Sequence, residues 1–147
     1  MKIALACDHG AVELKKKLWE HLEKQGYEVV NFGTDSAQSC DYPEYAGAAA
    51  RAVASGACER GIVLCTTGIG VSIAANKVPG IRCALLSDLL SAKLTRMHND
   101  TNMMAMGAGV IGESLALAIA DTWLTTPFSG EERHVRRIRK LRELDNL

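Results

Sequence analysis

A cysteine that closes an apolar run is the feature of this sequence that most directly suggests chemistry. Cys65 ends the run "GIVLC" at residues 61–65 and is followed by the loop "TTGIG" at residues 66–70. Where such a loop opens a helix, unpaired backbone N–H groups and the helix dipole favour an anion. A thiol in that setting can ionise more readily and serve as a base or nucleophile. The alternative is a small buried hydrophobe, the role that most cysteines have.

The glycine spacing of this loop argues against the common nucleotide-binding motifs. Gly68 and Gly70 are followed by Ile73 where G-x-G-x-x-G requires a third glycine, and the loop does not match G-x-x-x-x-G-K-[ST] either. Two interpretations stay open: an anion-binding loop, or a turn whose glycines serve the backbone conformation alone.

Two of the four histidines lie in predicted loops, where an imidazole can transfer protons or contact an anion. His9 follows the first apolar run in "CDHG", and His98 begins "HNDTN" directly after a predicted helix. For His98 the alternative is a polar turn that ends the helix. His21 and His134 fall inside predicted helices and are interpreted as ordinary helix residues.

The last predicted helix, residues 131–144, carries a basic face and an apolar stripe. Arg133 and Arg137 are four residues apart, so they share one face and can clamp a phosphate with charge-assisted hydrogen bonds. A solvated basic face is the alternative, because further basic residues share the helix. The apolar residues recur every third position, a narrow stripe suited to lying along a neighbour such as a second subunit. They are Val135, Ile138, Leu141 and Leu144.

Strand and helix patterns alternate along the rest of the chain. Apolar runs predict strands, and segments with helical periodicity or helix-ending residues predict helices. The strands are expected at residues 2–7, 27–31, 61–65, 81–86 and 103–106, and the helices at 11–25, 44–55, 70–77, 88–97 and 112–125. Continuous apolar strands between helices predict an α/β sandwich with a parallel sheet of about five strands.

The strand order of such a sheet decides which strand ends meet. Ligands bind beyond the carboxyl ends of parallel strands, at the point where the strand order reverses. In the order 2-1-3-4-5, the first and third strands are neighbours across that point. Asp8 and His9, which follow the first strand, would then face the Cys65 loop.

Length and composition predict one domain over residues 1–147 with a substantial core, since 48% of the residues are hydrophobic. Seventeen basic residues balance seventeen acidic ones, which argues against nucleic acid or an anionic membrane as the partner. No apolar run approaches the roughly 18 residues of a membrane span, and the N-terminus lacks a signal-peptide pattern, so we expect a cytoplasmic protein. Five cysteines without C-x-x-C spacing predict free thiols and no zinc cluster.

Five blocks of the chain, taken together, resemble the type B ribose-5-phosphate isomerases, within the family that also holds the galactose-6-phosphate isomerase subunits. The blocks are "CDHG", "DYPEYA", "GIVLCTTGIGVSIAANKVPGIR", "HNDTN" and "RHVRR", in this order from Lys2 to about Arg137. The resemblance implies a Rossmann-like three-layer sandwich and a homodimer, with a tetramer left open, whose active sites and C-terminal helices lie at the subunit interface. It also implies aldose-to-ketose isomerisation of a sugar phosphate through an enediolate, without metal or organic cofactor.

The same resemblance assigns roles to the residues that match the family's motifs. Cys65 matches the proton-transferring base, and His98 matches the acid that opens the sugar ring. Some relatives use a glutamate six positions after the cysteine, but Val71 stands there and cannot titrate. The other implied site residues are Asp8 and His9 for the sugar phosphate, Tyr42 near the cysteine, the backbone of Thr66, Thr67, Gly68, Ile69 and Gly70 for the oxyanion, Asn99 beside His98, and Arg133 and Arg137 for the phosphate in the partner's site.

Two positions depart from the pattern of the ribose-5-phosphate isomerases. Thr66 replaces a glycine after the cysteine, and Gly109 stands where a third phosphate-binding arginine is usual. Losing one charged hydrogen bond would weaken phosphate anchoring by about 1.5–3 kcal/mol. Because His98 is kept, ribose 5-phosphate is the first expected substrate, and another aldose phosphate, such as allose 6-phosphate or galactose 6-phosphate, is the second. A non-catalytic sugar-phosphate binding module and a thiol-redox protein that pairs Cys65 with Cys7 are the alternatives from other classes.

Overall fold

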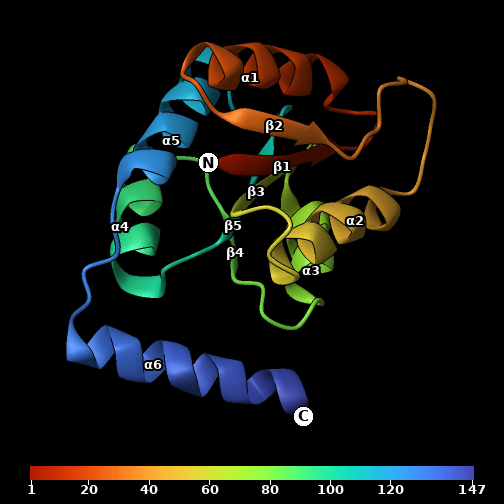
Figure 1. The fold of residues 1–147 in the computed structure, drawn as a ribbon. Helices are drawn as coiled ribbons and strands as arrows, with labels where there is room; N and C mark the ends of the chain where they lie inside the picture. Colours follow the sequence, from red (N-terminus) through yellow and green to blue (C-terminus); the bar gives the residue numbers. More distant parts are fainter.

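The computed structural model describes residues 1–147 as five strands and six α-helices that alternate along the chain (Figure 1). The strands are β1 (Lys2–Cys7), β2 (Glu28–Asn31), β3 (Arg60–Cys65), β4 (Cys83–Leu85) and β5 (Met103–Gly107). The helices are α1 (Val12–Lys24), α2 (Tyr42–Ala54), α3 (Ile69–Asn76), α4 (Leu89–Asn99), α5 (Glu113–Thr125) and α6 (Glu132–Glu143), followed by a 3-10 turn at Leu144–Asn146. Each predicted element is present, with ends shifted by a few residues. None of the helices has the length and apolar character needed to cross a bilayer.

The five strands form one parallel sheet in the order β2-β1-β3-β5-β4. The predicted parallel sheet is confirmed, and β1 and β3 are neighbours as expected, but the 2-1-3-4-5 order is wrong in its last two strands. The physical reason lies in the strands themselves, because every residue of β5 is buried and no residue of the short β4 is. A strand that is covered on both faces belongs inside the sheet, so β4 takes the edge.

Helices cover both faces of the sheet, which makes three layers. The helices α1, α4 and α5 pack on one face, where the buried cluster includes Leu18, Met104 and Trp123 (Figure 1). The helices α2 and α3 cover the other face, and small side chains such as Ala49 and Ala50 bring α2 close to the strands. Burying apolar surface in these two clusters stabilises the fold by about 25 cal/mol per Å² removed from water. The carboxyl ends of β1, β3 and β5 lie together at one edge of the sheet.

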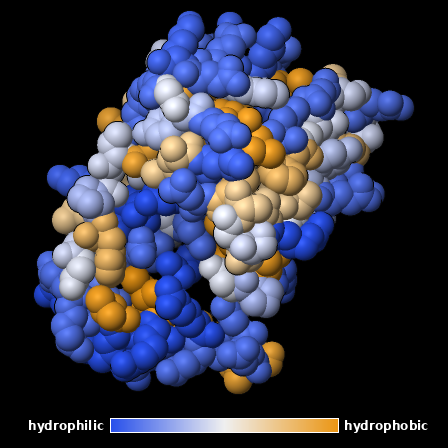
Figure 2. All heavy atoms as spheres, viewed as in Figure 1, coloured by the Kyte–Doolittle hydropathy of each residue, from blue (hydrophilic) through white to orange (hydrophobic).

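The last helix stands apart from the three layers. Figure 1 shows α6 beneath the sandwich, connected to it by the segment that follows α5. Ile138 is buried, whereas Val135, Leu141 and Leu144 keep between 45% and 59% of their surface exposed. A hollow of about 440 Å³ lies between the end of α6 and the β4 edge, and Figure 2 shows the surface indented between α6 and the sandwich. Most of the predicted apolar stripe is thus uncovered within one chain, and the dimer interface expected for it stays a prediction.

Candidate active site

Cys65 is the last residue of β3, and the loop after it leads directly into α3. The side chain is 6% exposed, and its Sγ accepts a hydrogen bond from the backbone N–H of Gly68 at 3.0 Å. Thr67 Oγ1 lies 4.0 Å from the same sulfur and accepts from the N–H of Ile69 at 3.2 Å. A backbone donor and the N-terminus of a helix therefore surround the sulfur, and the start of a helix is a place where backbone N–H groups can bind an anion.

The glycines of this loop are required by close contacts as well as by backbone conformation. Gly68 has a φ of +78°, in the left-handed region, and a Cβ there would lie 2.7 Å from the carbonyl carbon of Met106. A Cβ on Gly70 would lie 2.8 Å from the ring of Tyr42. Tyr42 thus covers the loop that follows Cys65. Because β5 and α2 press on the loop from two sides, its backbone N–H groups are held in place before any ligand arrives.

The first strand brings an acid and a histidine to the same edge of the sheet. The strand β1 pairs with β3, and the N–H of Asp8 donates to Leu64 O at 3.1 Å. Asp8 is 8% exposed, and its Oδ1 accepts from the N–H of Gly10 at 2.9 Å. The Nδ1 of His9 accepts from the N–H of Cys40 at 3.2 Å, which leaves Nε2 as the donor of the neutral ring. The predicted adjacency of the two strand ends is confirmed by the β1–β3 pairing, whereas the facing of the Asp8 and His9 side chains toward the glycine loop stays a prediction.

Thr66 fills the space between the ends of β1 and β5. A Cβ built on Gly10 would collide with Thr66 Oγ1, and a Cβ on Gly109 would lie 3.0 Å from Thr66 Cγ2. The N–H of Gly109 also donates to Thr66 O at 2.8 Å. The two departures from the isomerase pattern are therefore coupled in space, because a Cβ at position 109 would lie tightly against both the threonine methyl and, at 3.1 Å, the carbonyl oxygen of Thr66.

A second group of predicted residues lies at the end of α4 and on α6. His98 and Asn99 are the last residues of α4, and the centroid of the His98 ring is 4.5 Å from that of His134 on α6. Arg133 and Arg137 both lie on α6, four residues apart as predicted for a shared face, and both are exposed. Sequence reasoning did not include His134 in the site, although its place between the two arginines in "RHVRR" was an available signal.

The two groups do not form one closed site within a single chain. A cavity of about 300 Å³ is lined by His98 and Asn99, and another of about 230 Å³ is lined by Thr67 and other loop residues. The residues common to both linings are Leu85 and Leu86. The loop after β3 and the end of α4 are therefore separated by the last residue of β4 and the residue after it, on the edge of the sheet.

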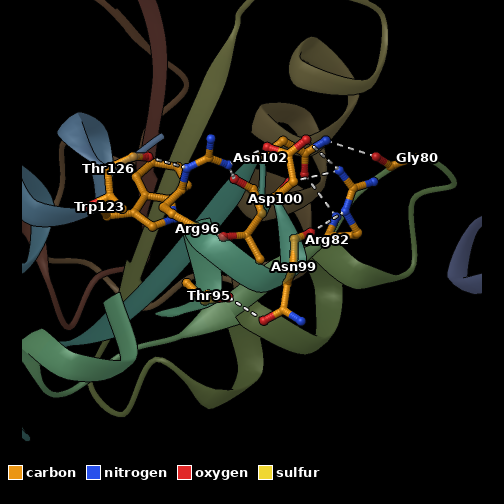
Figure 3. Close-up of polar contacts among 10 residues, drawn as sticks. Gly80, Arg82, Thr95, Arg96, Asn99, Asp100, Asn102, Trp123 and Thr126 are labelled. Atoms are coloured by element: carbon orange, nitrogen blue, oxygen red, sulfur yellow. Dashed lines mark hydrogen bonds and ion pairs between the residues drawn. The ribbon is translucent and has the colours of Figure 1, made fainter. Parts of the chain in front are cut away.

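A polar network holds the turn at Asp100 that ends α4, directly after Asn99 (Figure 3). Arg96 is 3% exposed, and its Nη1 donates to Asp100 Oδ1 at 2.8 Å. Arg82 donates from Nε to the carbonyl oxygen of Asn99 at 2.9 Å. Asp100 itself has a φ of +45°, the left-handed conformation that often follows a helix. The polar turn considered as the alternative for "HNDTN" is thus present, and it fixes the direction in which the end of α4 points.

Removing the Arg96 side chain is expected to destabilise the fold. Arg96→Ala would leave the carbonyl oxygens of Thr101 and Thr126 without their donor, at about 1–3 kcal/mol for each buried group. We therefore expect the free energy of unfolding, measured by urea denaturation, to fall by about 3 kcal/mol. Arg136→Ala is the matched control, because its ion pair with Glu132 is largely exposed and contributes about 0.5 kcal/mol. Equal losses in the two variants would contradict the structural role of Arg96.

Cys7 does not provide a redox partner for Cys65. All five cysteines are free thiols, as predicted. Cys7 is buried, its Sγ donates to Thr34 O at 3.4 Å, and burial raises the pKa of Cys7 to about 11. A thiol with that pKa is almost fully protonated at neutral pH and reacts slowly. Cys58 is buried and Cys83 is partly buried. No three His, Cys, Asp or Glu side chains converge on a common point where they could hold a metal ion.

The fold and the strand-end site define a class of protein: a three-layer α/β sandwich with a cysteine and a glycine loop at the point where the strand order reverses. Residues 3–141 match the Ribose/Galactose Isomerase family, and the chain belongs to that family. The family resemblance seen in the sequence is thereby confirmed.

Relatives of known name match nearly the whole chain. Ribose-5-phosphate isomerase B of Escherichia coli (strain K12) is 45% identical, over 98% of this chain and 96% of that protein. The structure of ribose-5-phosphate isomerase B from Clostridium thermocellum is 49% identical with a TM-score of 0.97, over 99% of this chain and 98% of that one. The enzyme from Mycoplasma genitalium, whose structure holds ribulose 5-phosphate, is 35% identical with a TM-score of 0.94, over 99% of this chain and 96% of that one.

Proposed function

We propose that this protein interconverts D-ribose 5-phosphate and D-ribulose 5-phosphate. The observation that carries the proposal is the Cys65 sulfur, which lies 3.0 Å from the N–H of Gly68 at the start of α3, beside the end of β1 that carries Asp8 and His9. Full-length relatives named ribose-5-phosphate isomerase B support the same substrate. The reaction requires a base, donors for an oxyanion and an anchor for the phosphate, all of which polypeptide groups can supply.

Cys65 acts as the base in this mechanism. Its thiolate takes the proton from carbon 2 of the open-chain aldose, and the enediolate that forms receives a proton at carbon 1 to give the ketose. Negative charge develops on the oxygen of carbon 1, where the backbone N–H groups of residues 66–70 other than those of Gly68 and Ile69, which are bonded within the loop, act as preorganised donors. Val71 is buried and apolar, so the helix that follows the loop offers no carboxylate in place of the thiol.

The groups on α4 and α6 act at the other end of the substrate, in the site of the partner subunit of a homodimer. His98 gives a proton to the ring oxygen and so opens the furanose, while Arg133 and Arg137 bind the phosphate. This arrangement is supported by the separation of these residues from the Cys65 loop within one chain and by the exposed apolar stripe of α6. The binding energy at the phosphate positions the reacting carbons over the base.

A hexose 6-phosphate is the second candidate substrate, and one observation favours it. Gly109 has no side chain to offer a phosphate, and Thr66 occupies the adjoining space. A site without that contact has less preference for one distance between the phosphate and the reacting carbons. The relative activity on pentose and hexose phosphates therefore depends on this pair of residues.

An arginine introduced at position 109 is expected to tighten the binding of ribose 5-phosphate only when the side chain of Thr66 is removed. Gly109→Arg alone drives the new Cβ against Thr66, so we expect a KM for ribose 5-phosphate at least about fivefold above wild type. In the double variant with Thr66→Gly, the added charged contact should instead bring the KM below the wild-type value. Steady-state kinetics of the two single variants and the double variant measure the coupling, and strictly additive effects would contradict it.

Isomerase assays on three sugar phosphates test the proposed function. The purified protein is given ribose 5-phosphate, allose 6-phosphate and galactose 6-phosphate in turn, and Cys65→Ala measures the background. The highest kcat/KM on ribose 5-phosphate supports the proposal. Preference for a hexose phosphate would identify Gly109 as a determinant of specificity, and binding without turnover of any sugar would favour a non-catalytic sugar-phosphate binding module.

A further inference from the structure

A buried histidine beside His98 has no part in the mechanism above. His134 is 5% exposed, and its ring centroid lies 4.5 Å from that of His98, with the ring planes tilted by 36°. The ring of Phe128 lies farther off, at 6.5 Å between centroids. His134 is thus confined by its surroundings, and its ring in turn restricts the orientations open to His98.

Ser129 connects this pair of histidines to both helices. Its Oγ lies 2.7 Å from Nδ1 of His134 and accepts from the N–H of Glu131 at 3.3 Å. Its own N–H donates to the carbonyl oxygen of Met97 at 3.2 Å, in the last turn of α4 and directly before His98. One serine therefore ties the start of α6 to the end of α4, so the two imidazole rings keep one relative orientation.

The charges around His134 favour its neutral form. Burial lowers the pKa of His134, and the positive charge of His98 lowers that pKa further. Arg133 and Arg137 act in the same direction, and Glu131 opposes them. Two imidazoles in ring contact resist carrying a proton at the same time. The His134 ring is therefore held in its neutral form beside His98.

We propose that His134 is a positioning residue for His98: Ser129 orients the His134 ring, and that ring aligns His98 for proton transfer to the ring oxygen of the sugar. The inference rests on the proposed isomerase function and on the role of His98 in it. Orientation of a catalytic group is a large part of its effect on rate. Loss of the ring contact should therefore slow the chemical step and leave the binding of the phosphate almost unchanged.

Kinetics of three variants test the positioning role. Ser129→Ala removes only a hydroxyl, so the fold is kept, and we expect kcat on ribose 5-phosphate to fall about tenfold with KM within about twofold of wild type. His134→Phe keeps a ring but loses Nδ1, and should show a similar fall together with a displaced acid limb of the pH profile. His134→Asn keeps a polar atom near the position of Nδ1 and should recover part of kcat. His21→Gln is the matched control, because His21 bonds Asp121 at 2.8 Å, between α1 and α5, and should leave kcat unchanged.

A histidine titration followed by NMR provides a readout that needs no substrate. In His98→Asn, the pKa of His134 should rise because a positive neighbour is lost, and an unchanged midpoint would overturn the inferred coupling. Wild-type kcat and pH profile in both Ser129→Ala and His134→Phe would overturn the positioning role while the isomerase function stands. Should His134→Phe fail to fold, Ser129→Ala decides alone. A wild-type protein with no isomerase activity would overturn the proposed function and this inference together.

Discussion

Replacing Cys65 by alanine is expected to abolish isomerase turnover and leave the protein folded. In the proposed mechanism this sulfur carries the proton between two carbons of the substrate, so kcat should fall by at least about 10³-fold. Contacts from Met106 and Tyr42 to the loop glycines remain in the variant, and only the hydrogen bond from the Gly68 N–H to the sulfur is lost, so the free energy of unfolding should fall by about 1–3 kcal/mol. Steady-state assays and urea denaturation measure the two effects. Deuterium exchange at carbon 2 of the substrate, followed by NMR, reports the proton transfer directly.

Cys58→Ala is the matched control for this variant. Cys58 is 3% exposed and belongs to the buried cluster between the sheet and the α2 and α3 helices. Its replacement removes a thiol of the same size without touching the glycine loop, so wild-type kcat is expected. An active Cys65→Ala enzyme would refute the assignment of the base. Equal losses of activity in Cys65→Ala and Cys58→Ala would instead show that the effect comes from impaired folding.

Mixing two inactive variants is expected to restore activity. One variant, Cys65→Ala, lacks the base; the other, with Arg133→Ala and Arg137→Ala together, lacks phosphate contacts that we place in the partner's site. In a hybrid dimer one site then has both an intact base and intact arginines, while the other site has neither. Random pairing of equal amounts makes half of the dimers hybrids with one working site, so co-expression should give about one quarter of wild-type turnover.

The exposed stripe of α6 supplies the control for this experiment. Leu141 is 45% exposed on that stripe, and Leu141→Glu in both chains would place charges in the interface that we propose. We expect this change to give monomers in size-exclusion chromatography and to remove the recovered activity. If hybrid dimers form and remain inactive, Cys65 and the arginines act within one chain, and the shared site is refuted.

Local sequence patterns predicted most of the fold. Apolar runs and helical periodicity predicted each strand and helix, because the burial of a single element depends on the spacing of its own side chains. The candidate base was predictable in the same way, since Cys65 lies between a continuous apolar run and the paired glycines of a loop. The adjacency of β1 and β3 was predictable from the common topology of parallel sheets. This adjacency places Asp8, which follows β1, at the same edge of the sheet as the Cys65 loop.

Pairings between distant segments were not predictable from such patterns. The exchange of β4 and β5 could not be read from the sequence, because both are short apolar segments and only the packed sheet shows which of them is covered on both faces. The contact of Thr66 with Gly109 depends on that exchange, since β5 then lies beside β3. Neither residue by itself indicates that it faces the other.

The sequence by itself determined the parallel α/β sandwich, the Cys65 loop at a strand end and the basic face of the last helix, because hydrophobic periodicity, glycine spacing and charge spacing are local properties. Only the tertiary structure decided that His134 lies against His98 and that Ser129 holds both helices at that point. Those contacts depend on the angle at which α6 leaves the sandwich, and no local pattern specifies that angle.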